Sequence, residues 1–123
     1  MAAEIIGTDD ALVTVRISGT LTQADLGAAQ KRMAGVIEAM GSIRILVLVE
    51  DFGGWEKGAA WNDFSFQEAQ DPHIERMAIV GEERWRDLVL LFTSQGLRQF
   101  PIEFFPPARR SEAHSWLGGG SHP

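Results

Sequence analysis

The chain has 123 residues, 45% of them hydrophobic and 23% charged, and a formal net charge of −6 at pH 7. These values are typical of one folded domain with a single core. The acidic balance disfavours nonspecific nucleic-acid binding, and the lack of cysteine excludes disulfides and thiolate metal sites. No uncharged run approaches the ~20 apolar residues of a membrane span.

The first predicted elements are a β-hairpin and an amphipathic helix. Residues 4–6 and 11–17 are rich in β-branched residues and flank a turn, which predicts two antiparallel strands that end at Gly19. Thr22 is a favoured N-cap and Gly41 a favoured C-cap for the helix that follows. Its apolar residues recur at helical spacing, at Leu26, Ala29, Met33, Val36, Ile37 and Met40.

The middle of the chain predicts a central strand, a turn and a second helix. Residues 43–49 are almost all aliphatic, which is typical of a strand buried on both faces in a parallel sheet. Residues 50–58 then predict a glycine-rich turn, and residues 59–66 an aromatic helix. This order of elements is the usual place for a site in an open α/β sheet.

The last third predicts strand, helix, strand and helix. Residues 75–81 suit a short strand, and the helix after it has Trp85, Leu88, Val89 and Phe92 on its predicted inward face. Residues 100–105 predict an edge strand because they contain a proline, and residues 107–117 predict a last helix.

Two further leucines widen the apolar arc of the third helix. Leu90 and Leu91 lie off its inward face, which suggests contact with a second subunit, a neighbouring helix or lipid.

Taken together, the elements predict an α/β fold with a mixed, mostly parallel five-stranded sheet and about four helices. Residues 1–117 are predicted to form one domain and the glycine-rich residues 118–123 a flexible tail. Glu4 lies where a secretory signal peptide would have its positively charged and then apolar residues, so no signal-peptide pattern is expected. We predict a cytoplasmic protein.

Three segments carry a resemblance to a known family: residues 50–63, residues 74–85, and residues 104–106 together with 112–117. Their order and spacing resemble the SpoIIAA-like proteins, small domains of the STAS/SEC14-like type. The resemblance runs from Ile5 to Leu117 and implies a mixed, mostly parallel sheet covered by helices. It also implies non-enzymatic binding of an apolar or lipid-like ligand, with membrane association proposed for relatives.

One departure from the STAS pattern bears on regulation. Anti-sigma-factor antagonists with this fold carry a phosphorylatable Ser or Thr where the helix after the central strand begins. Residues 51–60 contain no hydroxyl side chain, so no phosphorylation switch is expected at that place.

Aromatic residues gather around the predicted turn and form the candidate site. We predict that the ligand is bound by Phe52, Trp55, Trp61, Phe64 and Trp85. The turn residues Gly53, Gly54 and Gly58 are predicted to gate access. The alternative is an ordinary core with one exposed ring.

Other candidate groups are weaker, and neither a catalytic nor a metal site is predicted. Glu50, Asp51 and Asp63 are best interpreted as solvated acids, since no histidine or lysine accompanies them at a ligand-like spacing. The histidines are widely separated, at His73, His114 and His122.

The sequence therefore predicts a non-enzymatic, cofactor-free binding domain for an apolar or lipid-like molecule. The alternative is a STAS-like regulatory domain that binds another protein. A homodimer and a peripheral membrane contact stay open, and no nucleic-acid partner is expected.

Overall fold

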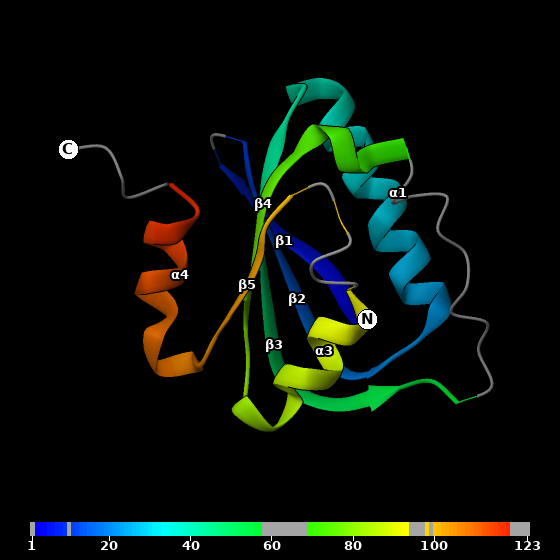
Figure 1. The fold of residues 1–123 in the computed structure, drawn as a ribbon. Coiled ribbons are helices and arrows are strands. Elements are labelled where there is room, and N and C mark those ends of the chain that lie inside the picture. The colour runs from blue at the N-terminus through cyan, green and yellow to red at the C-terminus, as the bar shows by residue number, and fades with distance from the viewer. Residues whose placement is uncertain (1, 10, 58–68, 94–97, 99, 119–123) are drawn as a thin grey trace.

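The computed structural model describes residues 2–9, 11–57, 69–93, 98 and 100–118. Within them the chain forms a five-stranded sheet in the order β1-β2-β3-β4-β5 (Figure 1). The strands are β1 (Ala3–Asp9), β2 (Leu12–Leu21), β3 (Ile43–Trp55), β4 (Ile74–Val80) and β5 (Ile102–Phe105). β1 pairs antiparallel with β2, and the other three neighbouring pairs are parallel. The predicted mixed, mostly parallel sheet is therefore confirmed.

Helices cover both faces of this sheet. The described residues include three α-helices: α1 (Gln23–Met40), α3 (Arg86–Phe92) and α4 (Arg110–Trp116). Figure 1 shows α1 and α3 on one face and α4 on the other. The aromatic helix predicted at residues 59–66 lies outside the described residues.

Local hydrogen bonds explain where α1 begins and ends. The side chain of Thr22 accepts a hydrogen bond from the backbone N–H of Asp25 at 3.0 Å, which satisfies an otherwise free donor of the first turn. Gly41 has φ +90°, and its N–H donates to the carbonyl of Ile37 at 2.7 Å. Both predicted caps are confirmed.

β3 lies at the centre of the sheet and is buried on both faces, as predicted. Ile45 and Val49 belong to the core beneath α1. Leu46 and Leu48 belong to a second core, where they pack with Leu117 beneath α4. Because side chains alternate along a strand, this run of aliphatic residues fills both layers at once.

The predicted turn at Gly53 and Gly54 is wrong, because β3 continues as a strand to Trp55. Ser18 of β2 pairs with Glu50, but the next residue, Gly19, pairs with Phe52, so Asp51 is an extra residue in β3. Asp51 takes φ +50°, a left-handed conformation that aspartate tolerates better than most residues. The predicted strand end at Gly19 is also wrong, since β2 runs on to Leu21.

A second irregularity follows directly in the same strand. Thr20 pairs with Gly54, so Gly53 is also an extra residue, and Gly54 has φ +105°. Each extra residue reverses the alternation of side chains. The first brings Phe52, instead of Asp51, to the face that carries Val47 and Val49, and the second returns Trp55 to that face.

Helix α3 is oriented differently from the prediction. Val89 is buried at the centre of its inner face, and Leu90 packs at the margin of the core. Leu88 was predicted to face inward but is 50% exposed, and Leu91 is 77% exposed. A single turn of 3-10 helix, Glu83–Trp85, precedes α3, and the buried face is centred on Val89, which turns Leu88 outward.

Candidate functional site

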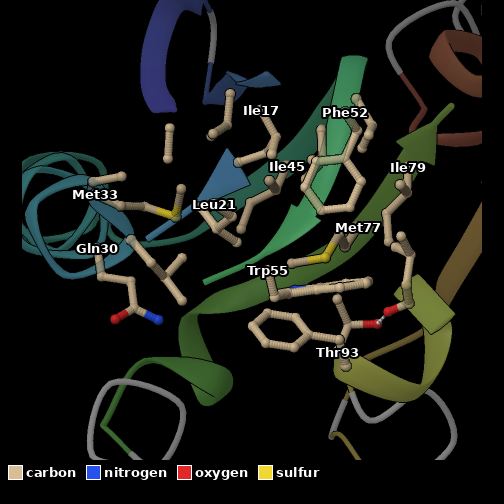
Figure 2. A pocket seen from close by; sticks show the side chains of 18 of the residues that line it. Ile17, Leu21, Gln30, Met33, Ile45, Phe52, Trp55, Met77, Ile79 and Thr93 are labelled. Carbon is tan, nitrogen blue, oxygen red and sulfur yellow. Dashed lines mark hydrogen bonds between the residues drawn. The ribbon is translucent and has the colours of Figure 1, made fainter. Parts of the chain in front are cut away.

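A cavity of about 440 Å³ lies between the sheet, α1 and α3. Its floor is aliphatic, with Val15 and Ile17 from β2 and Val47 from β3. Figure 2 shows Met33 and Gln30 of α1 on one side of it, and Phe52 and Trp55 of β3 farther across. The bulges of β3 therefore shape this cavity, because they direct both aromatic rings into its wall.

The described part of the predicted aromatic set comes together as one cluster. Phe52 packs edge to face against Trp55 and Trp85, with ring centroids 5.0 Å and 4.8 Å away. Trp55 also contacts Phe92 of α3 at 5.3 Å. Phe52 and Trp55 line the cavity, whereas Trp85 packs behind them. The predicted residues Trp61, Phe64 and Gly58 lie outside the described residues.

The two indole N–H groups of this cluster are covered by other atoms. Those of Trp55 and Trp85 are buried and have no hydrogen-bond partner within the described part of the chain. Their rings meet at 78°, an edge-to-face arrangement in which an aromatic face can accept an N–H weakly. The cluster therefore presents hydrocarbon, and not a hydrogen-bond donor, to the cavity.

The cavity opens to solvent between the first half of α1 and the end of α3. Gln23, Gly27 and Leu91 all line it and are all exposed. A Cβ added at Gly27 would meet no atom within 4 Å outside its own stretch of helix. Gly27 thus leaves free space at the mouth of the cavity, and a larger side chain at this position would narrow the opening.

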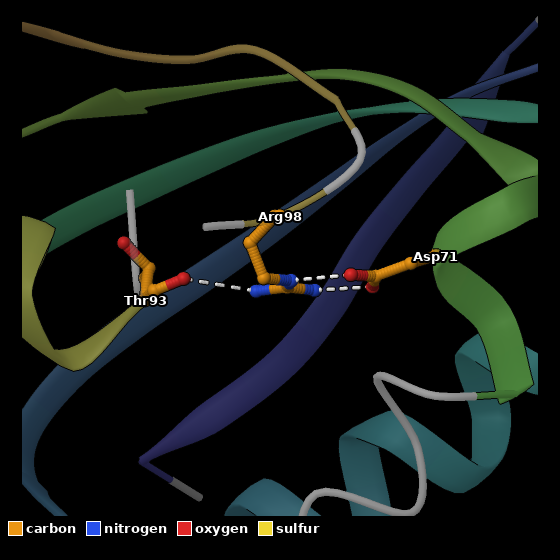
Figure 3. Close-up of polar contacts among 3 residues, drawn as sticks. All are labelled: Asp71, Thr93 and Arg98. Atoms are coloured by element: carbon orange, nitrogen blue, oxygen red, sulfur yellow. Dashed lines mark hydrogen bonds and ion pairs between the residues drawn. The ribbon is translucent and has the colours of Figure 1, made fainter. Parts of the chain in front are cut away.

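Arg98, which lines one wall of the cavity, belongs to a buried ion pair that the sequence did not reveal. Arg98 donates two hydrogen bonds to the Asp71 carboxylate, at 2.7 Å and 2.6 Å, and a third to the backbone carbonyl of Thr93 at 3.1 Å (Figure 3). The Arg98 and Asp71 side chains are only 7% and 8% exposed. The pair joins segments 27 residues apart, so no local pattern predicts it.

The acidic and histidine side chains considered from the sequence do not gather at this cavity. Glu50, Asp51 and His73 are exposed, and His114 is half-buried in α4. Asp63 and His122 lie outside the described residues. Across residues 2–9, 11–57, 69–93, 98 and 100–118, no group of three or more His, Asp or Glu side chains is placed to hold a metal ion.

Comparison with known proteins identifies the family. A family model described as SpoIIAA-like matches residues 12–118. The chain belongs to the SpoIIAA-like family. A solved structure of an uncharacterized protein with a SpoIIAA-like fold, from Shewanella loihica, aligns with a TM-score of 0.71 and 19% identity, covering 94% of this chain and 92% of that one. No curated protein matches.

The SpoIIAA-like assignment confirms the predicted family and supports a regulatory or binding domain. Folds of this type are typically non-enzymatic. None of the helices in the described ranges is both long and apolar enough to cross a membrane.

Proposed function

We propose that this SpoIIAA-like domain binds an apolar or lipid-like ligand, without catalysis, in the cavity beneath α1 and α3. The observation that carries the proposal is a space of about 440 Å³ with aliphatic and aromatic walls. Small-molecule sites typically enclose ~300–1,000 Å³ and are mostly apolar. Phe52, Trp55 and Phe92 supply the aromatic part of the wall, and Trp85 packs against the first two.

Burial of hydrocarbon supplies the affinity. Each methylene group moved from water into the cavity contributes about 0.8 kcal/mol, so a ten-carbon chain contributes roughly 8 kcal/mol before other terms. Loss of translational and rotational freedom removes at least ~4 kcal/mol of this. The remaining ~4 kcal/mol or less corresponds to a dissociation constant of about 1 mM or weaker for a ten-carbon chain, and each further buried methylene group tightens binding by about fourfold.

Access is predicted to pass Gly27, and not the glycines of β3. Gly53 and Gly54 lie within the paired strand and are not in a free turn. Gly27 and Leu91 stand at the opening itself. The gate predicted at Gly53 and Gly54 therefore lacks the turn that it required.

Blocking the mouth tests the proposal. Gly27→Leu fills open space at the cavity, and Gly35→Leu is its matched control, because Gly35 is an exposed glycine of the same helix outside the cavity lining. Both changes favour the helix by a similar amount. We expect Gly27→Leu to weaken binding of the uncharged dye Nile red by at least about tenfold, whereas Gly35→Leu binds like the wild type. Equal binding by the three proteins would contradict the proposal.

A second candidate is a regulatory interaction domain that uses α3. Leu88 and Leu91 are 50% and 77% exposed on one side of this helix, where a partner protein or a second copy could cover them. Light scattering tests the homodimer form: a dimer that Leu91→Glu dissociates supports it, and a strict monomer at high concentration contradicts it. Sedimentation with neutral lipid vesicles tests peripheral membrane contact through the same leucines.

A further inference from the structure

The polar groups of the cavity wall differ in whether they already have partners. The Thr93 hydroxyl donates to the carbonyls of Val89 and Leu90, at 3.0 Å and 3.2 Å. Arg98 donates to Asp71 and to the backbone of Thr93. These groups are satisfied within the protein, so a ligand gains little by approaching them.

Arg98 is the cationic side chain in the described lining, and its charge is already neutralised. A ligand carboxylate or phosphate that approached Arg98 would compete with Asp71, which binds it through both oxygens. Displacement would leave the Asp71 carboxylate buried, with its side chain 8% exposed, and without its partner. The net charge of −6 adds no attraction for an anion. The wall therefore disfavours an anionic ligand.

Gln30 is the contrasting case. It lies on the cavity face of α1, one turn from Gly27 at the mouth and one turn from the buried Met33. Its carboxamide makes no hydrogen bond to another described residue, and Figure 2 draws none from the lining side chains. A carboxamide both donates and accepts, and it carries no charge. It is therefore suited to an uncharged polar group.

We propose that the ligand is an uncharged amphiphile whose hydroxyl, amide or carbonyl group meets the Gln30 carboxamide. Its hydrocarbon lies along the aliphatic floor of β2 and β3. This inference rests on the proposed function of the cavity and adds the chemical class of the ligand. It assigns the polar end to α1, because the indole N–H groups of Trp55 and Trp85 are covered.

A matched pair of probes tests the class. 1-Decanol and decanoate both contain ten carbon atoms, but decanoate is ionised at neutral pH. We expect 1-decanol to displace Nile red from the wild type at about tenfold lower concentration than decanoate, because burying a charge without a partner is unfavourable. Equal or stronger displacement by decanoate would overturn the inference while leaving the proposed function in place.

Variants of Gln30 test the assigned position. Gln30→Leu should raise the 1-decanol concentration needed for displacement by about fivefold, since one hydrogen bond is lost. Gln30→Lys should shift the preference toward decanoate, whereas Ala39→Lys, which adds the same charge at an exposed site on α1 outside the cavity lining, should not. Circular dichroism and thermal unfolding confirm that each variant is folded.

The outcomes separate the two proposals. If the folded wild type does not bind Nile red or either decyl probe, the proposed function fails. If the wild type binds them but Gln30→Leu and Gln30→Lys leave the order of displacement unchanged, only the assignment of the polar end to Gln30 fails.

Discussion

Replacing Gly54 with alanine tests the bulged geometry that places Phe52 and Trp55 in the cavity wall. Gly54 has φ +105°, where an L-residue is strained. A Cβ at this position would meet the Trp85 ring at 3.8 Å, an ordinary contact, so the expected effect comes from the backbone and not from a clash. We expect Gly54→Ala to lower the free energy of unfolding by about 1–3 kcal/mol.

Gly53 provides the matched control one residue away. A Cβ there would lie 3.5 Å from the Thr20 hydroxyl oxygen, and the backbone does not carry the positive φ of Gly54. We therefore expect Gly53→Ala to change the stability by less than about 0.5 kcal/mol. Urea unfolding followed by tryptophan fluorescence measures both changes in the free energy of unfolding. The comparison requires that this free energy falls with urea concentration at the same rate in each variant. If the two variants have equal stability, the conformation assigned to Gly54 is wrong.

Two further predictions concern packing and the buried ion pair. Gly81→Ala should lower the free energy of unfolding by roughly 1–3 kcal/mol, because the added Cβ would lie 3.1 Å from the Cβ of Val49, which its own backbone holds in place; wild-type stability in urea would contradict this. Arg98→Leu should lower it by about 3–5 kcal/mol, since Asp71 would stay buried without a partner. The double variant Arg98→Leu/Asp71→Leu should recover part of that loss in thermal unfolding, and additive losses would show that the two side chains are not coupled.

Local sequence signals were sufficient for most of the fold. The Thr22 hydroxyl caps the first turn of α1, and Gly41 can take the positive φ that ends the last turn. Both effects act within one helical turn, so the ends of α1 could be predicted from these residues. The aliphatic run in β3 predicts a central strand because only such a strand is buried on both faces.

The bulges of β3 were missed for a physical reason. Asp51, Gly53 and Gly54 are typical of a turn, and nothing local distinguishes a turn from a strand that takes in two extra residues while its pairing with β2 continues. The orientation of α3 was also missed, since apolar residues surround most of that helix and only packing decides which of them are buried.

The candidate site was partly predictable. The surplus of aromatic residues near the middle strand indicated Phe52, Trp55 and Trp85, which do form one cluster. The cavity itself, the open position at Gly27 and the Arg98–Asp71 pair depend on contacts between distant segments, which single-sequence patterns do not contain. Gln30 is not one of the apolar residues whose spacing predicted its helix, and only the structure places it at the cavity.

Native mass spectrometry of the protein purified under gentle conditions tests the central claim most directly. The account predicts that wild-type protein and Gly35→Leu carry an added mass in the range of an uncharged lipid-like molecule, and that Gly27→Leu does not. A wild-type protein that is folded, carries no such mass and takes up neither Nile red nor 1-decanol when they are added would contradict the claim that this cavity is a binding site.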